Sequence, residues 1–412
     1  MVTRPINASR FPCFDGLRAL AALSVVAVHT TFVSGFTGRS GIGNYTSRLE
    51  IGVSVFFVIS GFLLYRPFAV AHFEGRDVSI PRFWTRRLKR IIPAYWAAFI
   101  VVTYVMHADK IRHGWAAVPV YLGFAQIYSP YYALSGITQA WSLCTEMTFY
   151  LALPLWAWCI GRRRRSPDSQ LRLELLGLGG WVAVSFVYRS IVLTAHGQLA
   201  LTMPNWLPGY TDLFALGMLL AVFTAWTAST GRSPRSLDHP SVPWISWAIA
   251  GGLFVWVSNI GLPVKPVTAS PLGLSLARQT LYALFAFFLV APAVVGPQDE
   301  GLVRRLLQTR PLVFLGTVSY GIYLWHEAWI DRFLHWSGDR LFTMSFLELL
   351  AFVVATATAA ASVSYFAIER PMLRGSIRIP RLPRRPRAIP VSAVNTEPDT
   401  AASNVATVGA AT

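Results

Sequence analysis

Residues 16–36 read GLRALAALSVVAVHTTFVSGF, an apolar run that titratable side chains interrupt only at Arg18 and His29. Crossing the hydrocarbon core of a membrane as a helix takes roughly 20 mostly apolar residues, so the run is long enough to span. A titratable group inside a membrane is costly and is by default a functional candidate. The run therefore predicts a spanning helix that carries chemistry.

The composition extends this interpretation to the whole chain. Of the 412 residues, 54% are hydrophobic and only 13% are charged, too few charges to cover soluble domains with so much apolar surface. We therefore predict an all-α integral membrane protein. The stretches that qualify or nearly qualify as spans are about 16–36, 51–71, 91–106, 115–128, 141–160, 174–195, 211–229, 243–262, 279–296, 312–335 and 343–367.

The positive charge decides how many of these stretches cross. The chain has 36 Lys and Arg against 19 Asp and Glu, and cytoplasmic loops are where Lys and Arg collect. If the weak stretch 115–128 crosses, the run Arg162–Arg165 falls outside; if it is re-entrant or interfacial, that run and the C-terminal arginines fall inside. We expect about ten spans in the cytoplasmic membrane, both termini cytoplasmic, and no nucleic-acid partner.

One membrane domain is expected over residues 1–375, followed by a disordered cytoplasmic tail over 376–412 that is rich in Arg and Pro and then in Ala and Thr. We expect the first span to be a retained helix, because it lacks the small-residue cleavage site of a signal peptide. Cys13, Cys144 and Cys159 have no metal or redox spacing, so they are interpreted as packing residues and no metal site is predicted.

Arg18 and His29 lie eleven residues apart. At about 100° per residue, eleven steps return to within about 20° of the starting direction, so both side chains share one face of the helix. At about 1.5 Å per residue they are about 16 Å apart along the axis. Arg18 is expected near the cytoplasmic end and His29 in the outer half.

Two later spans carry titratable groups at a similar depth. Glu146 is expected about 8 Å below the outer end of its span, and His326 about 22 Å above the inner end of its own. Both depths agree with that of His29, although each residue could also be a packing residue that only satisfies neighbouring polar groups. Glu146 belongs to an i,i+4 stripe of Ser142, Glu146 and Tyr150.

A basic run precedes the third span and contains Arg86, Arg87 and Arg90, of which Arg86 and Arg90 share a face if the run is helical. Guanidinium groups suit phosphate oxygens. Arg18 at a cytoplasmic mouth and His29 deeper in the membrane suggest a long donor with an anionic head, which acyl-coenzyme A fits. We expect it as a substrate, with no cofactor bound permanently. A positive-inside anchor explains the same charges.

Six motifs in residues 11–375 resemble the membrane-bound acyltransferase-3 family. They are FDGLRA at 14–19 with His29, GVSVFFVISGFL at 52–63, RRLKRIIPAY at 86–95, WSL at 141–143 with Glu146 and the Phe-Tyr pair at 149–150, SYGIYLWH at 319–326, and ERP at 369–371. Members of this family move acyl groups, commonly acetyl, onto hydroxyls of sugars, envelope glycans, glycolipids or macrolides. The resemblance implies that Arg18 and His29 are the essential pair and that Arg86, Arg87 and Arg90 form the basic loop.

These observations together predict a membrane O-acyltransferase with a carbohydrate, glycolipid or macrolide-like acceptor. His29 is the expected general base and Glu146 is expected to orient or charge its imidazole; a transient acyl-histidine is the alternative. Many relatives carry an added esterase-like extracytoplasmic domain, which this chain is expected to lack, so a separate extracytoplasmic partner is a further expectation. Residues expected to support the site without reacting are Asp15, Ser142, Tyr150, Ser319, Tyr323, His326 and Glu369, the last as partner of a loop arginine.

Two alternatives stay open. A transporter or flippase would use buried Arg18, His29 and Glu146 as a proton or anion path. Within the enzyme class, the donor could carry a longer or dicarboxylic acyl group such as succinyl. In either case the small residues Gly52, Ser54, Ser60 and Gly61 are expected to let helices approach closely within the surrounding membrane lipid.

Overall fold

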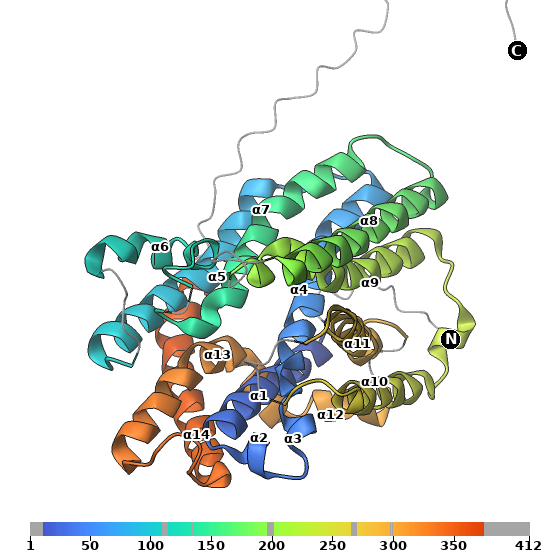
Figure 1. Cartoon of the computed structure of the whole chain (residues 1–412). Helices are drawn as coiled ribbons and strands as arrows, with labels where there is room; N and C mark the ends of the chain where they lie inside the picture. The colour runs from blue at the N-terminus through green and yellow to red at the C-terminus, as the bar shows by residue number, and fades with distance from the viewer. Residues whose placement is uncertain are drawn as a thin grey trace, which may run out of the picture. The chain divides into compact units, whose positions relative to one another are not determined.

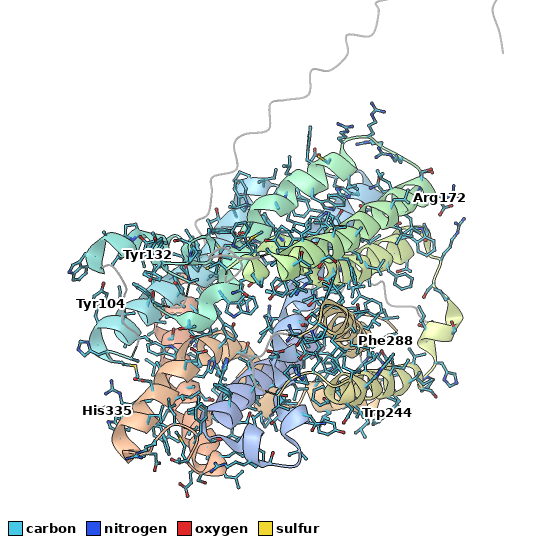
Figure 2. All side chains as sticks on the ribbon, viewed as in Figure 1. Tyr104, Tyr132, Arg172, Trp244, Phe288 and His335 are labelled. Carbon is cyan, nitrogen blue, oxygen red and sulfur yellow. The ribbon has the colours of Figure 1, made fainter. Side chains whose placement is uncertain are left out.

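The computed structural model describes residues 11–108, 114–133, 135–195, 202–264, 270–296, 298 and 300–374, and every regular element in these ranges is helical (Figure 1). The predicted tail, 376–412, lies outside the described residues. Side chains fill the spaces between the helices (Figure 2). The long helices are α1 Cys13–Val33, α4 Gly52–Glu74, α5 Ile80–Ile100, α7 Trp141–Gly161, α8 Pro167–Thr194, α9 Thr211–Thr230, α10 Val242–Asn259, α11 Leu272–Val290, α13 Arg310–Ser337 and α14 Phe346–Ser364.

Nine helical segments of the described chain are long and apolar enough to cross a membrane, and they correspond to nine of the ten predicted spans. The remaining predicted span, 312–335, is helix α13. With 28 residues it is long enough to cross, but side chains such as His326 and Glu327 lower its hydropathy. The chain is therefore a multi-pass, all-α membrane protein.

The weak stretch 115–128 forms short turns instead of a span. Its one α-helical segment, α6, covers only Val118–Leu122, about 8 Å of helix against a hydrocarbon core of about 30 Å. Pro119 stands at the start of this segment, and Phe124 adopts a positive φ of 59° just after it. As predicted, the stretch is too short to cross the membrane as a helix.

The basic run was expected in a cytoplasmic loop, with a helical form left open, and the structure shows that it is helical. Helix α5 begins at Ile80, with Pro81 in its first turn, and continues through the arginines into the apolar half. Proline is tolerated at this position because the first N–H groups of a helix have no partner within it. Arg, Lys, Leu and Ile sustain the basic half of the helix. Pro93 lies at the junction with the apolar half, and the helix continues through it.

Helix α5 is anchored to its neighbours through backbone carbonyls. The Tyr320 hydroxyl of α13 donates to the Ile91 carbonyl (3.0 Å), and the Trp84 indole donates to the Tyr150 carbonyl of α7 (3.0 Å). The Tyr150 carbonyl is free for this bond because its partner within α7 would be the nitrogen of Pro154, which carries no hydrogen. The arginines of α5 are therefore held against both α7 and α13.

Glycines set the closest helix contacts. A Cβ on Gly316 of α13 would lie 1.8 Å from the Asp15 carbonyl oxygen of α1, so these two backbones touch with no room for a side chain. The predicted roles of Gly52 and Gly61 are confirmed, since a Cβ on either would lie 2.5 Å or less from a backbone oxygen of α1 or α9 respectively. Ser60 instead faces a cavity described below.

Replacing Gly316 should separate α1 from α13. In Gly316→Ala the new methyl group overlaps a backbone oxygen, and overpacking of this kind costs about 1–3 kcal/mol. We expect a lower unfolding temperature of the detergent-purified protein. Gly251→Ala in α10 is the matched control, because a Cβ there meets nothing within 4 Å. Equal unfolding temperatures for the two variants would contradict the close contact.

Candidate functional site

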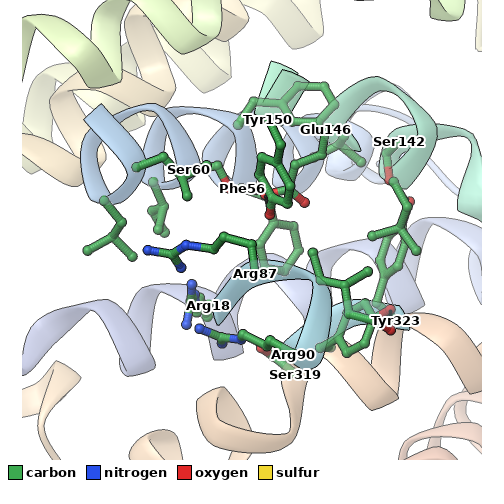
Figure 3. Close-up of a pocket in the computed structure, with 18 residues that line it drawn as sticks. Arg18, Phe56, Ser60, Arg87, Arg90, Ser142, Glu146, Tyr150, Ser319 and Tyr323 are labelled. Atoms are coloured by element: carbon green, nitrogen blue, oxygen red, sulfur yellow. Dashed lines mark hydrogen bonds between the residues drawn. The ribbon is translucent and has the colours of Figure 1, made fainter. Parts of the chain in front are cut away.

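Three arginines face one cavity between α1, α4, α5, α7 and α13 (Figure 3). Figure 3 shows the guanidinium groups of Arg18, Arg87 and Arg90 turned toward one another, with Glu146 across the cavity. The cavity measures about 90 Å³, and we call it the arginine cavity. Its polar lining residues are Arg18, Ser60, Arg87, Arg90, Ser142, Glu146, Tyr150, Ser319, Tyr320 and Tyr323.

The arginine cavity carries uncompensated positive charge. Three arginines against one glutamate leave a formal +2 on its lining. Within the described residues, no hydrogen bond or ion pair joins the side chain of Arg18, Arg87 or Arg90 to a partner. Like charges held this close repel one another, so the arrangement favours an anionic ligand, and guanidinium forks suit phosphate or carboxylate oxygens.

The predicted set of basic residues is corrected at Arg86. Arg86 is exposed and does not line the cavity, whereas Arg87 and Arg90 do. The inward face of α5 is set by Ile91 and Ala94, which are buried in the apolar half of the helix. Arg87 and Arg90 precede these two residues at helical spacing and share their stripe, but Arg86 points about 100° away from Arg87.

Glu146 is held inside the arginine cavity. Its Oε1 accepts hydrogen bonds from the Ser60 hydroxyl (2.5 Å) and from the Tyr150 hydroxyl (2.8 Å). The expectation that Glu146 orients His29 is therefore wrong, because other groups contact that imidazole. The rotation of α7 turns Glu146 toward Ser60 of α4.

His29 lines a second cavity, of about 180 Å³, which we call the histidine cavity. Val53 and Tyr323 line both cavities, so the two are neighbours along one face of α1. This agrees with the predicted common face of Arg18 and His29. The polar residues of the histidine cavity are His29, Glu50, Thr138, Gln139, Trp141, Tyr323 and Glu327.

A chain of hydrogen bonds fixes the protonation pattern of His29. The Nδ1 of His326 lies 2.9 Å from the Tyr323 carbonyl oxygen, which can only accept, so Nδ1 carries the hydrogen. In neutral His326 the Nε2 is then an acceptor, and His29 Nδ1 donates to it across 2.7 Å. The lone pair of neutral His29 is therefore on Nε2, which lies 3.6 Å from the Glu327 carboxylate.

Comparison with known proteins fits this geometry. A family model described as an acyltransferase domain, Acyl_transf_3, matches residues 11–365. The chain belongs to the acyltransferase-3 family. The predicted resemblance is thus confirmed over nearly the whole of the described helices, and it includes the helices that contribute Arg18, His29 and His326.

Named relatives of this acyltransferase-3 protein include the "Putative peptidoglycan O-acetyltransferase YrhL" of Bacillus subtilis, 27% identical over 88% of this chain and 54% of the relative. The peptidoglycan O-acetyltransferase OatA of Listeria monocytogenes is 26% identical, over 76% of this chain and 48% of its own length. The O-acetyltransferase OatA of Staphylococcus aureus is 25% identical, over 76% and 50%. The chain thus spans about half the length of these relatives. No solved structure matches it.

Two acidic residues that the sequence analysis did not include in the site line the histidine cavity of this acyltransferase-3 chain, namely Glu50 and Glu327. Glu327 follows His326 directly inside a span, which is a signal for function in a membrane segment. Glu50 lies in a short turn before α4, where a carboxylate is ordinary and gives no such signal. His326, expected to be a supporting residue, is the direct partner of His29.

The other predicted supporting residues take varied places. The Tyr323 hydroxyl donates its one hydrogen to the Gln139 carbonyl (2.8 Å). In the contact between Tyr323 and Ser142 (2.8 Å), the Ser142 hydroxyl is therefore the donor and the Tyr323 oxygen the acceptor. The Ser319 hydroxyl donates to the Gly316 carbonyl of its own helix and lines the arginine cavity. Asp15 lines neither cavity, and its backbone forms the contact with α13.

Glu369 was expected to be the partner of a loop arginine. No ion pair within 4 Å joins it to any residue that the structure describes, but Arg90 of α5 is close enough to act on its charge. Glu369 is 3% exposed, and its Oε1 has no hydrogen-bond partner. Arg90 of α5 is instead turned into the arginine cavity.

Proposed function

We propose that this protein is a membrane O-acetyltransferase that moves an acetyl group from acetyl-coenzyme A to a hydroxyl group of a cell-wall glycan. Membership of the acyltransferase-3 family supports the acyl-transfer chemistry, and the names of the relatives, peptidoglycan O-acetyltransferases, support the glycan acceptor. One observation carries the proposal. His29 Nε2 presents a lone pair in the histidine cavity, and the neighbouring arginine cavity holds three arginines that have no hydrogen-bond or ion-pair partner among the described residues.

The arginine cavity suits the donor. Its formal +2 charge favours the phosphates of coenzyme A, and the rise of α1 gives about 16 Å from Arg18 to His29 for the extended arm that carries the thioester. In this proposal the donor enters from the cytoplasm and the acceptor from the opposite side. The basic residues of α5 at the same cavity agree with a cytoplasmic entrance.

The proposed reaction uses one base, His29, and a nearby carboxylate, Glu327. The acceptor hydroxyl loses its proton to His29 Nε2 as its oxygen attacks the thioester carbonyl, and the C–S bond breaks as the tetrahedral intermediate collapses. The imidazolium then returns the proton to the departing thiolate, so the products are an O-acetyl ester and free coenzyme A. Glu327, at 3.6 Å, stabilises the positive charge on His29 while it holds the proton.

The decisive experiment tests transfer and its dependence on His29. Full-length protein in detergent or vesicles is given labelled acetyl-coenzyme A and peptidoglycan fragments, and the ester product is measured. His29→Ala should lower the rate by about 10²–10⁴-fold, the usual contribution of a general base. His335→Ala is the control, since it lies at the exposed end of α13 (Figure 2). Solute flux without thioester use would instead favour a transporter.

Two extensions of this assay resolve the remaining alternatives. Rapid quenching followed by mass analysis of the protein detects an acyl-histidine, which requires His29 Nε2 to attack the thioester directly. A labelled peptide at His29 that forms and decays at the turnover rate would replace the general-base mechanism. Succinyl-coenzyme A in place of acetyl-coenzyme A measures the acyl preference.

His326 should act as a positioning residue. His326→Phe removes the acceptor for His29 Nδ1, so the imidazole is free to rotate and to carry its hydrogen on Nε2, where it cannot act as a base. We expect kcat to fall at least about 10-fold while KM for the donor changes little, with partial recovery in His326→Gln, which can still accept a hydrogen bond. Unchanged kcat in His326→Phe would refute this role.

Arg87 and Arg86 form a natural pair of test and control. Arg87→Gln removes a charge from the arginine cavity, and losing a charged hydrogen bond costs about 1.5–3 kcal/mol, which corresponds to roughly 10–150-fold in KM for acetyl-coenzyme A. Arg86→Gln removes the same charge one residue away, outside the cavity, and should change KM less than about 2-fold. Similar effects of both substitutions would mean that the basic run acts only through its overall charge.

A further inference from the structure

The histidine cavity is unusually rich in hydrogen-bond acceptors. Its lining residues include Glu50, Glu327 and Gln139, together with His29, whose lone pair is on Nε2. Among its other polar lining residues, Tyr323 already donates to a backbone carbonyl, which leaves the Thr138 hydroxyl and the Trp141 indole as donors. A ligand that fits here must donate several hydrogen bonds.

Gln139 provides an acceptor that is buried and unused. Its side-chain nitrogen donates to the carbonyls of Leu324 (2.8 Å) and Tyr323 (3.4 Å), which fixes which end of the amide is the oxygen. The residue is 3% exposed, and its Oε1 has no hydrogen-bond partner in the described part of the chain. A buried carbonyl oxygen without a donor is costly, so a ligand donor at this place would stabilise the site.

Glu50 is held in position from outside the cavity. Tyr282 of α11 donates to its Oε1 across 3.1 Å, and Arg278 of the same helix pairs with that oxygen at 3.5 Å. Neither Tyr282 nor Arg278 lines the cavity. The lining residues of the histidine cavity thus carry a formal charge of −2, opposite in sign to the +2 of the arginine cavity, and Arg278 offsets part of the Glu50 charge from outside the cavity.

We infer that the histidine cavity is the binding site of an uncharged sugar, in which Glu50, Gln139 and Glu327 accept hydrogen bonds from ring hydroxyls that do not react. Trp141 also lines the cavity, and an indole ring can pack against the apolar face of a sugar ring. The inference rests on the proposed function and deepens it, because it names the groups that select the acceptor. The opposite charges of the two cavities keep the anionic head of the donor at the arginines, while its uncharged thioester arm reaches His29, and they disfavour anionic glycans in the histidine cavity.

The first test measures binding without the donor. Full-length protein in detergent is titrated with a neutral N-acetylglucosamine oligomer and, separately, with a uronic acid oligomer of equal length, and tryptophan fluorescence or calorimetry reports binding. We expect the neutral oligomer to bind at least 10-fold more tightly than the acidic one. In Glu50→Gln the neutral oligomer should bind about 5- to 10-fold more weakly, and the preference over the acidic oligomer should shrink.

The control for that substitution is Glu348→Gln, which removes an exposed glutamate of α14 outside both cavities. Unfolding temperatures show whether each variant is folded, and Trp141→Leu is a second binding variant should Glu50→Gln unfold. Equal binding of the neutral and acidic oligomers, or equal binding by wild type and Glu50→Gln, would overturn the inference.

The second test measures transfer kinetics. Glu50→Gln should raise KM for the acceptor by about 5- to 10-fold and leave KM for acetyl-coenzyme A within 2-fold of wild type. A rise in the donor KM alone would overturn the assignment of this cavity. Sugar binding without any acetyl transfer would instead refute the proposed function and leave the sugar site intact.

A metal ion is the competing ligand for the same groups. The ligand atoms of His29, His326 and Glu327 lie within 4.8 Å of one another, although a shared ion would have to replace the hydrogen bond between the two imidazoles. Sugar binding should therefore be unaffected by chelators and by added Zn²⁺ at low concentration. Loss of sugar binding with a chelator, restored by Zn²⁺, would overturn the inference in favour of a metal centre.

Discussion

The contact between α1 and α13 is the constraint on which the site depends. Near one end, the Asp15 carbonyl lies against Gly316 with no room for a Cβ, and further along His29 is bonded to His326 across 2.7 Å. A rotation of either helix changes both contacts together, because both join the same two helices. Packing of backbone against backbone therefore also sets the angle at which the two imidazoles meet.

The same arrangement explains why two cavities of opposite charge can coexist in one bundle. Each cavity takes its charges from different neighbours of α1: the arginine cavity from α5 and α7, and the histidine cavity from α13 and the turn before α4. Val53 and Tyr323 lie at their common boundary. Because the charged groups face their own cavity and solvent, neither set of like charges has to be buried against hydrocarbon.

Sequence periodicity predicted which residues share a face of one helix, but it did not predict which residues of neighbouring helices contact them. The common face of Arg18 and His29 follows from eleven steps of 100°. In the structure these two residues line adjoining cavities, which agrees with the prediction. The partner of His29 does not follow from any such count, because the rotation of α7 and α13 about their axes depends on all of their contacts. Depth alone left Glu146 and His326 equally close to His29, and only His326 is in contact with it.

The error at Arg86 has a different origin. The spacing of Arg86 and Arg90 predicted a common face in a helical run, but it did not show which face of the helix points inward. Once the run is the first half of α5, the buried Ile91 and Ala94 extend their stripe backward to Arg90 and Arg87, and the exposed position of Arg86 follows. Glu50 had no comparable signal, because its place depends on Arg278 and Tyr282, more than 200 residues later in the chain.

The His326 side chain contributes both to the packing of the helices and to the proposed chemistry. Fully buried, its imidazole would be costly in a membrane interior unless both nitrogens had partners, and the Tyr323 carbonyl and His29 supply them. The bonds that make its burial tolerable are the same bonds that place the lone pair of His29 in the cavity. In the proposed mechanism, correct packing of this helix pair places the base in its reactive tautomer before any substrate arrives, and loss of that packing would remove stability and the base together.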